Sequence, residues 1–351
     1  MIFANDIRFG GYRIGQGQPA FVIAEIGVNH NGNLRLAFQL IDAAAKAGAN
    51  AAKFQSFRAS RLAIPGAPKA AYQTRNTGGG SQLDMLRPLE LSIADHRRLI
   101  NHCHRRKILF LSSCFDQVEA DLLEALHVPA FKVPSGELTN LPLLSHIARK
   151  GRPMIVSTGM SSLKEVGDAV GIIQKGGGRQ LILLHCVSDY PANPAEANLL
   201  AMKTLAESFR TPVGFSDHTP GIEVSLAAVT LGAVVIEKHL TLDRSLPGPD
   251  HLASLEPAEF DALVRGIRIV ESSLGDGNKR ISRGERATVA VARKSFVAIR
   301  DIPVGTRLSS GLVELRRPGT GLPPTAWPKL RGRITRRRIP AMTPLSWNMF
   351  T

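Results

Sequence analysis

Short apolar runs rich in β-branched residues alternate with amphipathic stretches from Pro19 to about Ser273. The apolar runs predict eight strands: Phe21–Gly27, Ala51–Phe57, Ile108–Cys114, Ala130–Gly136, Pro153–Gly159, Leu181–Val187, Thr211–Asp217 and Val234–Leu240. The stretches between them have the 3.6-residue period of helices, as in Leu34–Ala47, Ile93–Arg106, Val118–Leu126, Leu163–Gln174, Leu199–Ser208 and Gly221–Leu231. Eight alternations in about 250 residues fit a closed parallel (β/α)8 barrel, or TIM barrel, better than an open sheet.

The pattern changes after Leu274, where the turn-rich segment GDGNKR interrupts the alternation. The remaining sequence, FVAIRDIPVGTRLSSGLVELRRPGTGLPP and its continuation, consists of short strand-like runs broken by Pro and Gly. We therefore predict a barrel domain over residues 1–275, a linker over 276–288 and a small β-rich domain over 289–351.

Composition indicates a folded protein, because 44% of the 351 residues are hydrophobic and only 21% are charged. No apolar run approaches the roughly 18 to 20 residues of a membrane span, and residues 1–15 lack the apolar core of a signal peptide. We expect a cytoplasmic protein without a membrane partner. Cys103, Cys114 and Cys186 have no CxxC spacing, which favours buried reduced thiols over a disulfide framework.

The net charge of +15 is concentrated near the end of the chain. From Lys279 onward, sixteen Lys and Arg residues face three acidic residues, which places about +13 of the charge there. One alternative is a nucleic-acid-binding module on a non-catalytic barrel, but interleaved aromatic residues, zinc-finger motifs and helix-turn-helix motifs are missing. A solvated basic face that attracts anionic substrates is the interpretation we favour, and we expect no nucleic-acid partner.

Polar residues stand at the carboxyl ends of all eight predicted strands. In a barrel of this kind the loops that follow the strands converge on one rim, where catalysis takes place. The strand-end residues are Glu25, Lys53, Gln55, Ser112, Ser113, Lys132, Ser135, Glu137, Ser157, Thr158, His185, Ser188, Ser216, Asp217, His218, Glu237, Lys238 and His239. We predict an active site at this rim.

Two of these residues, His218 and His239, end successive predicted strands. If the strands are neighbours, both imidazoles can bind one divalent ion, and the ligand types suit Mn²⁺, Mg²⁺ or Zn²⁺. The alternative is a structural pair of hydrogen-bonded histidines.

Lys53 and Lys132 occupy apolar surroundings, AAKFQ and AFKVPSG, where an ammonium group needs an anion. They can hold a phosphate and a carboxylate, with help from the hydroxyl groups of Ser113, Ser135, Ser157 and Ser216. Alternatively, they form salt bridges with Glu25 and Glu137. A further alternative is a metal-free aldolase in which one of the lysines forms a Schiff base.

Eight motifs, in order, resemble the sialic acid synthases: EIGVNHNG at 25–32, KFQSF at 53–57, FKVPSGE at 131–137, STGM at 157–160, HCVSDYP at 185–191, GFSDHT at 214–219, EKHLTLD at 237–243 and PGPDH at 247–251. The segment RRPGTG at 316–321 resembles the antifreeze-like SAF domain of those enzymes. The resemblance covers the whole predicted barrel and extends into the C-terminal domain.

The resemblance implies a role for each matching residue. It implies a divalent metal, usually Mn²⁺, on His218 and His239. It implies a phosphoenolpyruvate site made of Lys53, Ser113, Lys132, Ser135, Ser157 and Ser216, with Ser188 where some members carry Asn. It implies an amino-sugar site made of Glu25, Glu137 and Asp250, with Gln55 and Tyr190 nearby. It also implies a domain-swapped homodimer in which Arg317 of the partner subunit's SAF domain completes that site.

The activity implied is condensation of phosphoenolpyruvate with N-acetylmannosamine and water, which gives a nine-carbon sugar acid and phosphate. Lys53 and Lys132 would hold the anionic groups, and Glu25 or Glu137 would activate water or protonate the new alkoxide. The sugar could instead be N-acetylmannosamine 6-phosphate or a diacetamido-trideoxy sugar leading to legionaminic or pseudaminic acid. N-acetylmannosamine is the first choice from the sequence.

Overall fold

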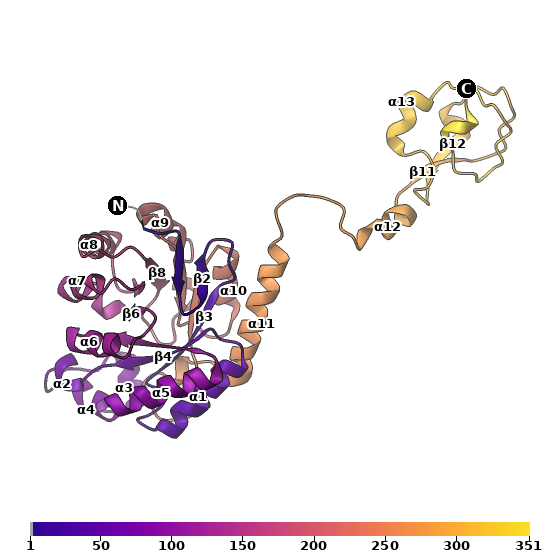
Figure 1. Ribbon diagram of the computed structural model, residues 1–351. Helices are drawn as coiled ribbons and strands as arrows, with labels where there is room; N and C mark the ends of the chain where they lie inside the picture. The colour runs from indigo at the N-terminus through magenta and orange to yellow at the C-terminus, as the bar shows by residue number, and fades with distance from the viewer. Residues whose placement is uncertain (1–2) are drawn as a thin grey trace. The chain divides into compact units, whose positions relative to one another are not determined.

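The computed structural model describes residues 3–351, which fold into two compact units that divide between Gly275 and Asp276. The first unit is a closed barrel of eight parallel strands in the order β10-β3-β4-β5-β6-β7-β8-β9 (Figure 1). The strands are β3 (Phe21–Gly27), β4 (Ala51–Ser56), β5 (Leu109–Cys114), β6 (Phe131–Val133), β7 (Met154–Ser157), β8 (Leu181–Cys186), β9 (Val213–Asp217) and β10 (Val235–His239). The predicted TIM barrel is confirmed, and each strand lies within a predicted run.

Helices pack around the outside of the barrel (Figure 1). They are α1 (Leu34–Lys46), α5 (Ile93–Arg106), α6 (Gln117–Ala125), α7 (Leu141–Arg149), α8 (Leu163–Lys175), α9 (Ala201–Phe209), α10 (Glu223–Thr230) and α11 (Pro257–Leu274). Side-chain caps begin several of them: Asn33 accepts hydrogen bonds from the first turn of α1, and Ser92 and Ser162 form capping boxes at α5 and α8. Within residues 3–351, no helix is long and apolar enough to cross a membrane.

A hairpin near the N-terminus, β1 (Asp6–Phe9) and β2 (Tyr12–Gly15), was not predicted. Its apolar residues Ile7, Phe9 and Ile14 are buried together with residues from the starts of the barrel strands, such as Phe21. The rings of Phe9 and Phe21 meet edge to face at 5.3 Å. The hairpin therefore packs against the amino-terminal end of the barrel interior, opposite the rim predicted to carry the active site.

A second addition, between β4 and α5, contains α2 (Ala59–Leu62), α3 (Ala71–Thr77), α4 (Gln82–Leu86) and the 3-10 turn η1 (Arg87–Leu89). It has a small hydrophobic core of its own, which includes Phe57, Leu83 and Leu89. Further 3-10 turns are η2 (Ser135–Glu137), η3 (Pro194–Glu196), η4 (His251–Ala253), η5 (Ser310–Leu312), η6 (Pro324–Ala326) and η7 (Trp347–Met349).

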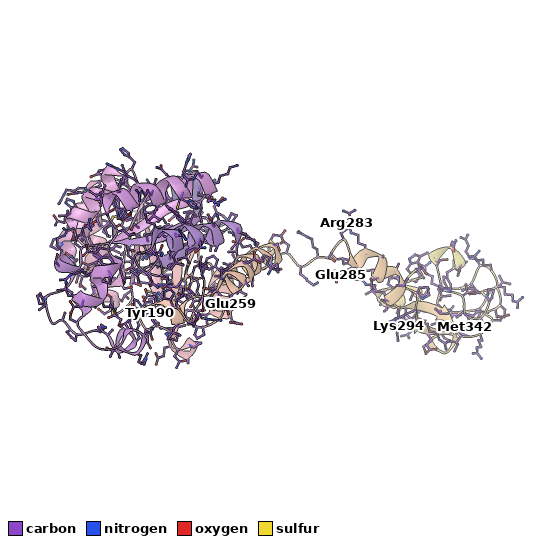
Figure 2. The ribbon with its side chains drawn as sticks, turned by 90° about the horizontal axis from the view of Figure 1, so that it is seen from below. Tyr190, Glu259, Arg283, Glu285, Lys294 and Met342 are labelled. Carbon is purple, nitrogen blue, oxygen red and sulfur yellow. The ribbon has the colours of Figure 1, made fainter. Side chains whose placement is uncertain are left out.

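The second unit is built around the antiparallel pair β11 (Ser295–Ala298) and β12 (Val313–Arg316), with the short helix α13 (Trp327–Leu330). Isolated bridges such as Ile302 with Ile339 extend the pairing. Twelve buried apolar residues form its separate core. A helix that was not predicted, α12 (Glu285–Ala292), begins inside the expected linker; Figure 2 labels Glu285 at its start and Lys294 just beyond its end.

We predict that Ile7→Ala lowers the free energy of unfolding of the barrel by about 2–5 kcal/mol, because it leaves a cavity under the barrel floor. Urea unfolding followed by far-ultraviolet circular dichroism measures this. Tryptophan fluorescence would not serve, since Trp327 and Trp347 both lie in the second unit. Arg8→Ala on the same strand, with 72% of the side chain exposed, is the control. Equal unfolding midpoints for the two variants would contradict the prediction.

Candidate active site

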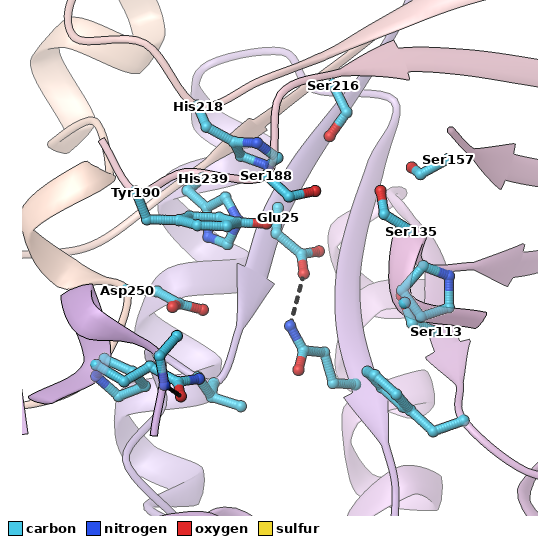
Figure 3. A pocket seen from close by; sticks show the side chains of 18 of the residues that line it. Glu25, Ser113, Ser135, Ser157, Ser188, Tyr190, Ser216, His218, His239 and Asp250 are labelled. Atoms are coloured by element: carbon cyan, nitrogen blue, oxygen red, sulfur yellow. Dashed lines mark hydrogen bonds between the residues drawn. The ribbon is translucent and has the colours of Figure 1, made fainter. Parts of the chain in front are cut away.

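A cavity of about 390 Å³ opens at the carboxyl ends of the barrel strands. Fourteen of the predicted site residues line it: Glu25, Lys53, Gln55, Ser113, Lys132, Ser135, Glu137, Ser157, Ser188, Tyr190, Ser216, His218, His239 and Asp250. In Figure 3 the serines 113, 135, 157 and 216 stand on one side and Asp250 on the other, with Glu25 between them. The fold thus gathers residues that are up to 225 positions apart in the chain into one pocket.

Lys53 lies at the base of this cavity with 2% of its surface exposed. Its Nζ is 2.7 Å from Glu25 Oε2 and 3.6 Å from Glu237 Oε2, and it donates a hydrogen bond to Ser113 Oγ at 3.0 Å. Burial disfavours the ammonium form, but the two carboxylates outweigh it and raise the pKa of Lys53. The side chain is therefore a permanent cation facing the pocket.

Lys132, on β6, is equally buried and also lines the base of the cavity. It donates to Ser157 Oγ at 2.8 Å and lies 3.6 Å from Glu237 Oε1. Burial lowers its pKa, and Glu237 opposes the shift. The salt bridge to Glu137 considered above does not form. Glu137 instead accepts a hydrogen bond from Asn140 Nδ2 at 2.7 Å.

Glu237 is among the strand-end residues of the predicted rim, but the sequence pattern alone did not assign it a role in the site. It is 4% exposed, accepts a hydrogen bond from Ser216 Oγ at 2.9 Å and lies near both lysines. Burial opposes its charge, but Lys132 and Lys53 outweigh burial and lower its pKa. The missed signal was strand alternation: Glu237 is two residues before His239, so both face the same side.

Carboxyl groups elsewhere in the pocket are held less firmly in the charged form. Burial raises the pKa of Glu25 to about 7, against the opposing effect of Lys53. Glu25 Oε1 also accepts a hydrogen bond from Gln55 Nε2 at 3.2 Å (Figure 3). Burial likewise raises the pKa of Asp250 to about 6, and it also raises that of the half-buried Glu137. Glu25 and Asp250 can therefore exchange protons near neutral pH.

The two predicted metal ligands lie on the neighbouring strand ends of β9 and β10, with ring centroids 5.5 Å apart. His218 Nδ1 donates to the carbonyl oxygen of Val187 at 2.7 Å, which leaves Nε2 as a lone-pair donor. Burial lowers the pKa of His218 to about 4 and lowers that of His239 well below its ordinary value. Both rings are therefore neutral, the form that binds metals. The ring of Tyr190 lies 4.2 Å from His218 and 5.6 Å from His239.

These features fit a metal site with two protein ligands and open positions. His239 Nδ1 is buried, with no hydrogen-bond partner in the described part of the chain. Across residues 3–351, no group of three or more His, Cys, Asp or Glu side chains is placed to hold an ion. Such an open site leaves positions that water or substrate can occupy.

The serine hydroxyl groups of the pocket differ in whether they already have a hydrogen-bond partner. Ser135 Oγ accepts a hydrogen bond from the backbone of Gly159 and contacts Cys186 Sγ at 3.1 Å. Ser188 stands where some members of the resembled family carry Asn. Its Oγ is buried and has no hydrogen-bond partner among the described residues. A buried hydroxyl without a partner in a pocket is suited to a ligand. All three cysteines are buried and free within the described chain.

Five of the strand-end residues face the helices and not the pocket. They are Ser112, Thr158, His185, Asp217 and Lys238. Ser112 forms a hydrogen bond with the hydroxyl group of Ser56. Thr158 and His185 form hydrogen bonds with the carbonyl oxygens of Leu184 and Ala197. The expectation that all strand-end polar groups meet at one rim is wrong for these five, because successive side chains of a strand point to opposite faces.

The fully buried ion pair of Lys238 and Asp217 belongs to this outer layer. Lys238 Nζ is 2.9 Å from Asp217 Oδ2, and both side chains are completely buried. Asp217 also accepts hydrogen bonds from Ser225 and Thr219, and Lys238 donates to the Thr219 carbonyl oxygen. The network ties β9 and β10 to α10 behind the two histidines.

Arg317 lies in the second unit, directly after β12. Its guanidinium is exposed, and Nε donates to the carbonyl oxygen of Ala292 at 2.9 Å. The residues that line the cavity all belong to the first unit, and Arg317 is not among them.

The barrel, its polar rim and the small β unit define a two-domain barrel synthase, and sequence comparison identifies its family. Residues 40–279 match the NeuB family and residues 293–351 match the SAF domain. The chain belongs to the NeuB family. The predicted family, the predicted SAF domain and the predicted enzyme class, a condensing synthase of the transferase type, are thus confirmed.

Relatives cover nearly the whole chain. An N,N'-diacetyllegionaminic acid synthase of Campylobacter jejuni is 46% identical over 90% of this chain and 96% of its own. One of Legionella pneumophila is 46% identical over 95% of each chain. A crystal structure of an N-acetylneuraminic acid (sialic acid) synthetase from Leptospira borgpetersenii, in complex with citrate, is 36% identical, with a TM-score of 0.72 over 82% of this chain and 96% of that one.

Proposed function

We propose that this chain is an N,N'-diacetyllegionaminic acid synthase, which condenses phosphoenolpyruvate with a diacetamido-trideoxy sugar and releases phosphate. The 46% identity to two synthases of that name, against 36% to a sialic acid synthetase, favours this product over the sialic acid expected first. We therefore propose the diacetamido-trideoxy sugar as the substrate in place of N-acetylmannosamine. The observation that carries the reaction type is the pair of buried ammonium groups facing the same cavity as the two histidines.

Lys53 and Lys132 bind the phosphate and carboxylate of phosphoenolpyruvate in this proposal. Both ions are already desolvated, so an anionic substrate gains strong attraction at little further cost. The hydroxyl groups of Ser113, Ser135, Ser157, Ser188 and Ser216 supply hydrogen bonds to the same anion. Glu237, between the two lysines, keeps their charge balanced before the substrate arrives.

The reaction joins the enol carbon of phosphoenolpyruvate to the aldehyde carbon of the open-chain sugar. The aldehyde oxygen takes up a proton, water adds to the carbon that bears the phosphate ester, and phosphate leaves with cleavage of that carbon–oxygen bond. Glu25 lies beside Lys53, in register with His239, where it can pass a proton to the new hydroxyl group or take one from the water. Glu137 is the other candidate for one of these two transfers.

A divalent ion, Mn²⁺ in our proposal, would be held by His218 and His239. When bound, it would polarise the sugar aldehyde and make its carbon more electrophilic. Tyr190, packed against both rings, orients the imidazoles from the sugar side of the pocket. Gln55 and Asp250 offer hydrogen bonds to the sugar hydroxyl and amide groups.

The direct test is phosphate release from phosphoenolpyruvate, measured with the diacetamido-trideoxy sugar, N-acetylmannosamine and N-acetylmannosamine 6-phosphate, with Mn²⁺ added or withheld. We expect the highest kcat/KM with the diacetamido-trideoxy sugar and loss of turnover in a chelator. Sodium borohydride with either substrate should leave no adduct on Lys53 or Lys132. A trapped adduct together with full activity in chelator would replace this proposal with an imine-forming aldolase.

His218→Ala and His239→Ala should each lower kcat about 100-fold or more, since each removes one of two metal ligands. The bound Mn²⁺ per chain, measured by metal analysis after dialysis, should fall in parallel while circular dichroism stays unchanged. His146→Ala, on the outer face of α7, is the matched control. Retention of both metal and turnover in either pocket variant would rule out the histidine pair as ligands.

We further propose that the enzyme is a domain-swapped homodimer in which the partner subunit's Arg317 completes the sugar site. Lys132→Ala damages the barrel site and Arg317→Ala damages the SAF contribution, so each variant alone should be inactive. Co-expressed chains that pair at random should regain about a quarter of wild-type activity, because half of the dimers then hold one intact site. No recovery in co-purified mixed dimers would place the arginine in the same chain as its site, and full activity of Arg317→Ala alone would place it outside the site.

A further inference from the structure

The insertion between β4 and α5 gives part of the active-site cavity an apolar surface. Leu62 of α2 and Met85 and Leu86 of α4 line the cavity and belong to the small core of the insertion, and we call these three residues the wall. The polar residues Tyr72, Gln73 and Gln82 of the same insertion line the cavity beside it. Val28 and Phe115, from the segments after β3 and β5, continue the wall on either side. In a pocket whose base is charged, this surface is suited to a part of the substrate without hydrogen-bonding groups.

The wall lies at the mouth of the cavity and the anion site lies at its base. Lys53 and Lys132 are residues of the strands themselves, whereas β4 ends at Ser56 and the wall residues come after that point. Because the sugar aldehyde must meet the enol carbon near the two lysines, the opposite end of the open-chain sugar extends toward the mouth. The insertion is therefore positioned to contact the far end of the sugar.

A contact between aromatic rings fixes the insertion relative to the reacting groups. Tyr72 of α3 packs on Tyr190 with ring centroids 4.9 Å apart, and Tyr190 in turn packs on His218. Asn76 of the same helix donates a hydrogen bond to the carbonyl oxygen of Pro249, next to Asp250. Two contacts of α3, one with Tyr190 and one with Pro249, thus connect the insertion to the sugar side of the pocket.

We infer that the wall formed by Leu62, Met85 and Leu86 selects the deoxy end of the sugar by contacting its terminal methyl group. The inference rests on the proposed function. A diacetamido-trideoxy sugar ends in a methyl group where N-acetylmannosamine carries a hydroxymethyl group. Leu offers no hydrogen-bonding atom and Met only a weak acceptor, so a terminal hydroxyl group placed against these three side chains would lose water without gaining a hydrogen bond from them. Such pockets discriminate against an added hydroxyl by about 10- to 100-fold.

The test compares kcat/KM for phosphate release with the two sugars in Met85→Gln, a substitution of similar length that adds an amide. We expect the ratio of the diacetamido-trideoxy sugar to N-acetylmannosamine to fall at least about tenfold. Met85→Leu should keep the wild-type ratio, because it restores an apolar surface. Ile64→Gln is the matched control on the same insertion, since Ile64 is 76% exposed and lies outside the cavity lining.

Leu62→Asn provides a second variant if Met85→Gln is unstable, and thermal unfolding by circular dichroism monitors folding in each. A wall that only supports the fold would lower kcat/KM for both sugars equally, and that result would overturn the inference. An unchanged ratio in a folded variant would overturn it too, whereas a wild-type preference for N-acetylmannosamine would defeat the proposed product and the inference with it. Failure of the wild-type enzyme to release phosphate with any of the sugars would instead defeat the proposed function, and the inference with it.

Discussion

Two ammonium groups buried under the mouth of the barrel are the constraint on which the rest of the site depends. Lys53 and Lys132 are each 2% exposed, and a charge so deeply buried is strongly unfavourable unless an opposite charge lies close. Glu237 lies 3.6 Å from both, and Glu25 pairs with Lys53. This arrangement stores two cations and two carboxylates in a space that water scarcely reaches, where electrostatic contacts with a bound anion are strongest.

Strand alternation divides the strand-end polar residues into two layers with different tasks. Ser216, His218, Glu237 and His239 face the cavity, while Asp217 and Lys238, interleaved with them, face α10 and form a completely buried pair. The outer layer holds the strands in place. The residues of the inner layer can therefore change their charge and protonation without loosening the barrel. A single residue of slippage along β9 or β10 would exchange the two layers and destroy both.

The cavity also changes character from base to mouth. Its base consists of charged and hydroxyl side chains on the strands, and its mouth includes the apolar face of the insertion that carries Leu62 and Met85. In our proposal the strands bind the anion and the insertion contacts the sugar, so changes in the insertion would alter the sugar that is accepted without altering the reaction.

The sequence by itself determined the barrel, since its strands recur as apolar runs whose period is a local property of the chain. It also determined which residue types gather at the rim, because parallel strands place their carboxyl ends together. Only the tertiary structure decided that Lys132 pairs with Glu237 and not with Glu137, that Asp217 and Lys238 turn away from the pocket, and that the hairpin around Ile7 closes the barrel floor. Those outcomes depend on strand register and on contacts between distant segments, which no local pattern of residues encodes.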